Sequence, residues 1–93
     1  MNIEKINQYV KERDEALLKD DIPAFEEFLK RNTENGIISD KIYNHFINAD
    51  EIIKKGTMYK MICNIPSMPK ELVKKAKKWL KKQDMTELYF KKD

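Results

Sequence analysis

Two side chains in this 93-residue chain are of the types most often used in nucleophilic or metal chemistry, His45 and Cys63, and each is the only one of its kind. A transition-metal site usually needs three or four suitable ligands, so this pair with scattered carboxylates does not indicate one. A nucleophilic cysteine needs a base and a group that orients the base, and the sequence supplies no identifiable orienting group. We therefore expect a protein that is not an enzyme and that holds no metal or cofactor.

The charged residues are unevenly distributed along the chain, although the net charge is only +3. Residues 1–53 contain seven Lys or Arg and twelve Asp or Glu, whereas residues 54–93 contain twelve lysines and four acids. Such asymmetry is typical of surfaces that bind nucleic acids or acidic proteins. The alternative is a codon effect of an AT-rich genome, because lysine outnumbers arginine seventeen to two.

Much of the positive charge falls in one predicted helix, about residues 68–82, on the face opposite Trp79. The candidate binding surface consists of Lys70, Lys74, Lys75, Lys77, Lys78, Lys81 and Lys82. Such a face suits sequence-independent contact with a phosphate backbone, an acidic protein groove or a membrane surface. It can equally be a solvated face over a buried stripe. Specific base readout is not expected, because both arginines, Arg13 and Arg31, are far away in the sequence.

Helix boundaries can be placed from capping residues. A first amphipathic helix is predicted over residues 3–19, and Asp20-Asp21 then caps a second helix that ends at Asn35-Gly36. Ser39 is predicted to cap a third helix, and Asn48 with Glu51 has the spacing of a capping box for a fourth. Gly56 is expected either to break or to bend that fourth helix. The prolines after Ile65 mark a stop before the fifth.

These elements predict an all-α fold, a small bundle of four to five short helices forming a single domain over residues 1–93. The tail from Met85 to Phe90 is predicted to be either a short strand or an extended segment packed on the core. No apolar run approaches the length of a membrane span, and the lone Cys63 suits a reducing compartment. With no secretory signal at the N-terminus, we expect a cytoplasmic protein. The predicted core is Ile6, Val10, Leu17, Phe25, Phe28, Leu29, Ile42, Phe46, Ile52, Ile62, Leu72, Ala76, Trp79 and Leu80.

Two blocks of sequence resemble a group of short, uncharacterised helical proteins encoded in prophages and mobile elements of Firmicutes. The first block is Ile6–Leu18; the second is Lys60–Ser67 with its continuation from Leu72 to Leu80. The likeness covers about half the chain, and residues 31–57 depart from the pattern. No catalytic motif comes with it.

The resemblance implies a genomic setting in which small proteins without active sites bind and block a host protein, including CRISPR effectors and other defence systems. In that case the divergent middle is a candidate partner surface, whose acidic residues Glu34, Asp40 and Asp50 would mimic phosphates. The expected function is thus a protein-binding inhibitor. The alternative is a non-specific nucleic-acid-binding protein that uses the lysine-rich helix. The sequence does not specify the partner or the oligomeric state.

Overall fold

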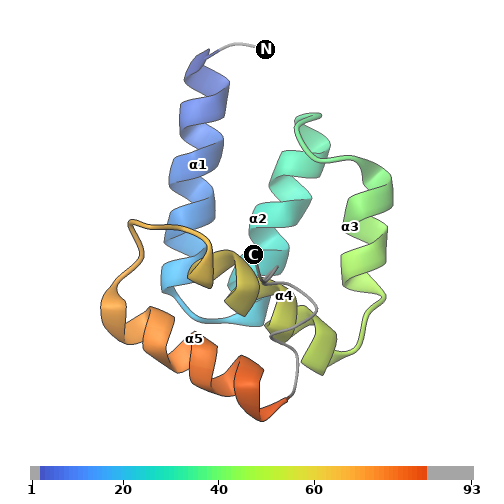
Figure 1. The fold of residues 1–93 in the computed structure, drawn as a ribbon. Helices are drawn as coiled ribbons and strands as arrows, with labels where there is room; N and C mark the ends of the chain where they lie inside the picture. The colour runs from blue at the N-terminus through green and yellow to red at the C-terminus, as the bar shows by residue number, and fades with distance from the viewer. Residues whose placement is uncertain (1–2, 84–93) are drawn as a thin grey trace, which may run out of the picture. The chain divides into compact units, whose positions relative to one another are not determined.

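Five α-helices follow one another in the computed structural model, which describes residues 3–83 (Figure 1). No strand occurs within residues 3–83, so the predicted all-α fold is confirmed. The tail segment Met85–Phe90 lies outside the described residues. The helices are α1 (Ile3–Leu18), α2 (Ile22–Glu34), α3 (Asp40–Ile47), α4 (Glu51–Cys63) and α5 (Lys70–Lys82).

The chain divides into two compact units between Asp50 and Glu51. In the described residues, the first unit contains α1, α2 and α3, and the second contains α4 and α5. The prediction of a single domain over residues 1–93 stays a prediction.

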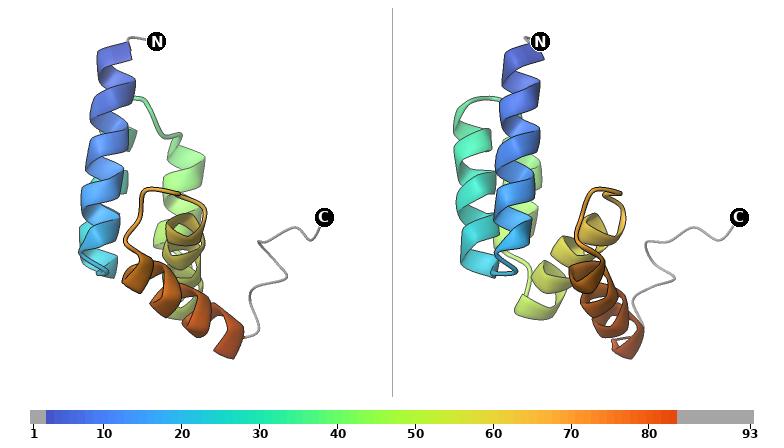
Figure 2. Two further views of the ribbon diagram at one scale, coloured as in Figure 1. Left: turned by 60° about the vertical axis from the view of Figure 1, so that its left-hand side comes forward. Right: turned by 90° about the vertical axis from the view of Figure 1, so that its left-hand side faces the viewer.

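In the first unit α2 packs against both α1 and α3 (Figure 2). The ring centroids of Tyr9 and Phe28 are 5.4 Å apart, which joins α1 to α2. Phe25 of α2 meets Phe46 of α3 at 5.4 Å with an edge-on geometry. Such aromatic pairs add to the stabilisation from buried area. All three phenylalanines are buried, as predicted.

Two of the predicted caps are confirmed. The Asp21 side chain accepts a hydrogen bond from the Ala24 N–H (3.2 Å), and the Ser39 hydroxyl oxygen accepts one from the Ile42 N–H (3.2 Å). Each bond satisfies an N–H that the first helical turn leaves without an intrahelical partner.

The end of α2 is a turn that requires its glycine. The Ile37 N–H donates to the Asn32 carbonyl (2.9 Å) and the Gly36 N–H to the Thr33 carbonyl (3.1 Å), the bond pattern of a Schellman motif. Gly36 has a φ of +85°, in the left-handed region that glycine tolerates best.

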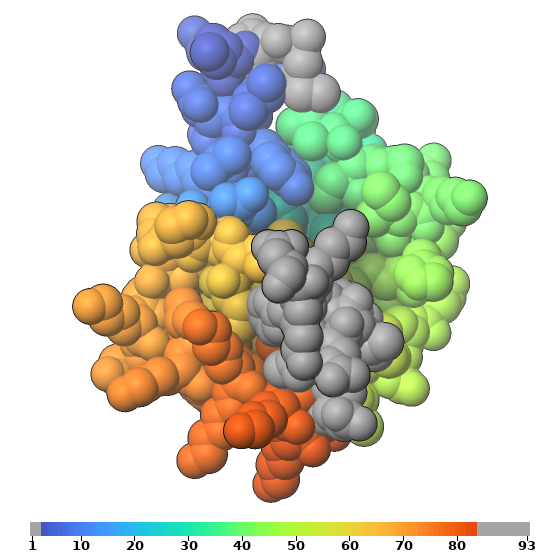
Figure 3. All heavy atoms as spheres, in the orientation of Figure 1, coloured from blue at the N-terminus to red at the C-terminus, as the bar shows by residue number. Residues whose placement is uncertain are grey.

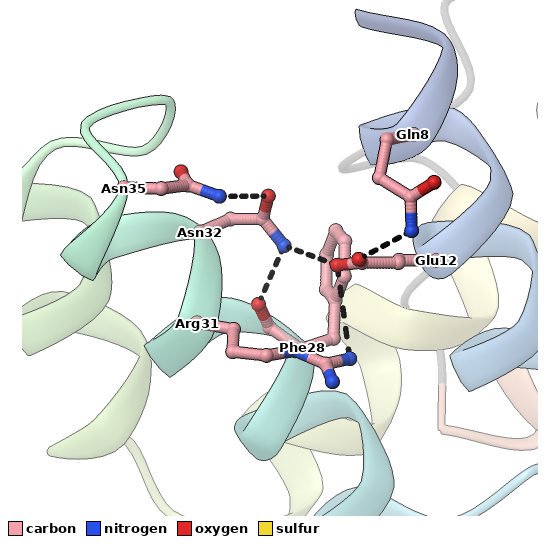
Figure 4. Close-up of polar contacts among 6 residues, drawn as sticks. All are labelled: Gln8, Glu12, Phe28, Arg31, Asn32 and Asn35. Atoms are coloured by element: carbon pink, nitrogen blue, oxygen red, sulfur yellow. Dashed lines mark hydrogen bonds and ion pairs between the residues drawn. The ribbon is translucent and has the colours of Figure 1, made fainter. Parts of the chain in front are cut away.

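A polar network that the sequence did not predict joins α1 to α2 (Figure 4). Glu12 accepts hydrogen bonds from Gln8 (2.8 Å) and from the amide of buried Asn32 (3.3 Å), and it lies 3.7 Å from the Arg31 guanidinium. The Asn32 amide also donates to the Phe28 carbonyl, and its oxygen accepts from Asn35. The bond from Gln8, with smaller contributions from Asn32 and Arg31, lowers the pKa of Glu12 despite partial burial.

The second unit is a helical hairpin in which α5 packs against α4. Its core comprises Met58, Tyr59, Ile62, Met68, Ala76 and Leu80. Gly56 neither breaks nor ends α4, which runs continuously from Glu51 to Cys63. Lys60 is a charged residue that is also buried in this unit, with 4% of its surface exposed. Burial lowers the pKa of its ammonium group to about 8.

Four of the predicted core residues are exposed, so the prediction is wrong at these positions. Ile6 and Val10 are 41% and 37% exposed, although Leu17, on the same side of α1 about two turns after Val10, is completely buried. In the first half of α1 the contacts with α2 come from Tyr9 and Glu12, roughly 100° around the helix from Ile6 and Val10. Ile42 and Ile52 are also exposed.

Ile42 and Ile52 both lie in the first turn of a helix whose buried residues come later. The only buried residue of α3 is Phe46, and the buried residues of α4 begin at Gly56. The predicted capping box is wrong as well, because Asn48 is the C-cap of α3 and its N–H donates to the Asn44 carbonyl (3.1 Å). Helix α4 starts only at Glu51.

Candidate functional site

Helix α5 holds the predicted lysine surface and is positioned by its apolar side. Ala76 and Leu80 are completely buried, whereas Leu72 and Trp79 are half-buried. Pro69 is the N-cap residue, and its carbonyl accepts from the Val73 N–H (3.0 Å). The remaining arc of the helix therefore faces solvent.

Trp79 lies at the border of the buried stripe rather than at its centre, which corrects the prediction that it is a core residue. Its ring meets buried Tyr59 of α4 edge-on, with centroids 5.4 Å apart. The Lys55 ammonium lies 5.4 Å from the Tyr59 centroid and 5.5 Å from that of Trp79, a cation–π arrangement. The rings of Tyr59 and Trp79 thus contact each other and Lys55 within the hairpin.

All seven predicted lysines are exposed on α5. At 100° per residue they occupy an arc of roughly 160°, in two rows. The near row is Lys70, Lys74, Lys77 and Lys81; the far row is Lys75, Lys78 and Lys82. Side chains of α5 project from the face drawn in Figure 3, where this helix is orange to red.

A groove lies beside the near row and was not predicted from the sequence. Its volume is about 480 Å³, and it forms where the loop after α4 meets the first half of α5. Most of its lining is apolar, and the charged residues at its border are Lys70, Lys74, Lys77 and Glu71. The other lining residues are Cys63, Ile65, Pro66, Met68 and Val73. The Ile65–Pro69 segment signalled a helix boundary in the sequence, but no sequence pattern showed that it forms a concave surface.

Cys63 lies half-buried in this groove. Burial raises the pKa of its thiol, and the positive charge of Lys77 opposes that change without reversing it. A reactive cysteine depends on a lowered pKa, so this environment disfavours the thiolate at neutral pH.

The three acidic candidates are exposed and lie on separate segments. Glu34 is the last residue of α2, Asp40 is the first of α3, and Asp50 immediately precedes α4. Asp40 accordingly lies where the helix dipole favours a negative charge. The structure brings the lysines together on one helix face, whereas these acids are distributed over helix ends.

Within residues 3–83, no three His, Cys, Asp or Glu side chains gather in a way that could hold a metal ion. No helix of the described chain is long and apolar enough to cross a membrane. In comparisons with known proteins, the chain matches no family model, no curated protein and no solved structure. The two features that indicate a function are therefore the row of exposed lysines on α5 and the groove beside it.

Proposed function

We propose that this chain is a non-enzymatic binding protein that inhibits a partner protein, and that the groove and the near row of α5 form its binding surface. The observation that carries the proposal is the combination of a mainly apolar groove with three lysines at its border, Lys70, Lys74 and Lys77. Protein interfaces typically combine an apolar centre with a polar rim, and this surface has both.

The resemblance to small proteins of Firmicutes prophages and mobile elements supports a host protein as the target. A defence effector such as a CRISPR nuclease is the target class that this setting suggests, by analogy rather than from the site itself. We place the protein in the cytoplasm, where Cys63 would stay reduced and where such effectors act.

A tagged pull-down from a bacterial host lysate, with and without nuclease, tests this proposal. A defined protein partner should be recovered in both conditions, and it should be lost when Lys70, Lys74 and Lys77 are replaced by glutamine. If nuclease removes everything that is recovered, inhibition of a protein partner is refuted.

A second candidate function, non-specific nucleic-acid binding, is supported by the width of the lysine arc. The far row extends the positive surface beyond the groove, as a protein that follows a phosphate backbone would need. A salt titration distinguishes the two functions. Binding to phosphates should weaken log-linearly with salt, by about one power of ten in affinity per power of ten in salt for each phosphate neutralised. An interface with an apolar centre should respond less.

A further inference from the structure

The groove and the near row share three side chains, so one ligand can engage both. Lys70, Lys74 and Lys77 border the groove, and Lys81 continues their row along α5. From Lys74 to Lys81 the helix rises about 10 Å. An extended peptide covers this distance in about three residues, and its alternate side chains, about 6.6 Å apart, all point to one face.

We propose that this surface binds an extended acidic segment of a protein, with one large apolar side chain in the groove and carboxylates at alternate positions along the near row. This inference rests on the proposed protein-binding function and specifies the chemistry of the partner. Charge complementarity supports it, because the near row has four exposed lysines and only Glu71 opposes them at the groove.

The groove favours such a segment over a nucleic acid for two reasons. None of the residues that line it is aromatic, so it offers no platform for base stacking. Tyr59 and Trp79 of the same hairpin already pack against each other.

The far row provides a matched control on the same helix. Replacing Lys70, Lys74 and Lys77 by glutamine removes three charges from the groove side, and replacing Lys75, Lys78 and Lys82 removes three from the other side. All six side chains are exposed, so both variants should keep the core and the helix. Thermal melts followed by circular dichroism check that they are folded.

Three probes then test the inference by NMR titration of the ¹⁵N-labelled protein. They are a short synthetic peptide with one leucine beside three glutamates at alternate positions, the same peptide with serine in place of leucine, and a single-stranded oligothymidylate of equal charge. The leucine peptide should bind tightest and should shift the amide signals of Ile65, Val73 and Lys74.

The near-row variant should bind this peptide about tenfold more weakly, as expected for three exposed ion pairs, and the far-row variant should change affinity less than about threefold. Replacing Cys63 by phenylalanine places a bulky side chain in the groove. It should abolish the preference for leucine over serine while leaving the charge of the lysines unchanged.

Two outcomes overturn the inference. One is equal affinity for the leucine and serine peptides. The other is that the near-row and far-row variants weaken binding of the leucine peptide equally and that the oligothymidylate binds at least as tightly as this peptide. The proposed function is judged separately, by the pull-down. A nuclease-resistant protein partner whose recovery is unaffected by both the near-row variant and Cys63→Phe would show binding through another surface. The inference and the assigned binding surface would then both fail, whereas inhibition of a protein partner would stand.

Discussion

Replacing Lys60 by methionine is expected to stabilise the protein at neutral pH. The residue is 4% exposed, and its amine nitrogen has less than 1 Å² of accessible surface. Charging a group in such a place carries a desolvation penalty, which is why the pKa falls from 10.5 to about 8. Methionine keeps a similar length and flexibility without the charge.

The magnitude follows from the shift in pKa. A difference of about 2.5 units corresponds to about 3 kcal/mol, since each unit is 1.36 kcal/mol. Below pH 8 both the folded and unfolded states hold the proton, and the folded state bears the full penalty. Between pH 8 and 10.5 the unfolded state binds more protons, so the stability of the wild-type protein should rise through this range. The methionine variant lacks this rise.

Urea unfolding at a series of pH values from 6 to 10.5 measures both effects. At pH 7 the variant should be more stable by about 3 kcal/mol, which for a chain of this size shifts Tm upward by more than about 10 °C. The advantage should shrink as pH increases. Lys78→Met, on the exposed side of α5, is the matched control and should change stability by less than about 0.5 kcal/mol. If Lys60→Met does not change stability at pH 7, or changes it by the same amount at every pH, burial of the Lys60 charge does not destabilise the protein as argued.

Three further predictions concern the first unit. Gly36→Ala should lower the free energy of unfolding by about 1 kcal/mol in urea titrations, through backbone strain alone, because φ is +85° and an added Cβ meets nothing within 4 Å. Phe28→Ala should lower the free energy of unfolding by about 3–5 kcal/mol, because Phe28 is buried, whereas Val10→Ser should lower it by less than about 1 kcal/mol. Equal losses of stability in thermal melts would contradict the burial found for these side chains. Glu12→Gln should reduce stability at pH 7. Because the folded-state pKa of Glu12 is lowered, the difference from wild type should disappear as pH falls through that pKa, and acid titrations of both proteins would show whether it does.

Sequence reasoning succeeded for two of the three predicted side-chain caps, which depend on neighbouring residues, and failed for the capping box at Asn48. Asp21 and Ser39 cap their helices because a cap involves a side chain and an N–H three residues later. The lysines of α5 share one side because a helical repeat determines their direction.

The errors in the predicted core arose where distant segments decide which side chains are covered. On α1 the sequence predicts that Ile6 and Val10 are buried, because they are aliphatic and share one side of the helix with Leu17, but of these three only Leu17 is buried. In the first half of α1 the contacts with α2 come from Tyr9 and Glu12, and Glu12 is accommodated there because Asn32 and Arg31 of α2 provide hydrogen bonding and charge.

The groove was missed for the same reason. Its lining comes from the end of α4, the following loop and the start of α5, and its shape depends on how the hairpin closes. Lys60 was missed because lysine is seldom buried, so periodicity alone gives no reason to place one in a core.

The turn after α2 has a consequence for the chemical ageing of the protein. Asn-Gly sequences deamidate when the glycine nitrogen attacks the asparagine side chain and forms a succinimide. Here that nitrogen is part of a hydrogen bond to the Thr33 carbonyl, and the Asn35 side chain is held by bonds to Asn32 and to the Ile37 N–H. Deamidation at Asn35 therefore requires the end of α2 to open first. Its rate in the folded protein, compared with that of a free peptide of the same sequence, measures how often this turn opens.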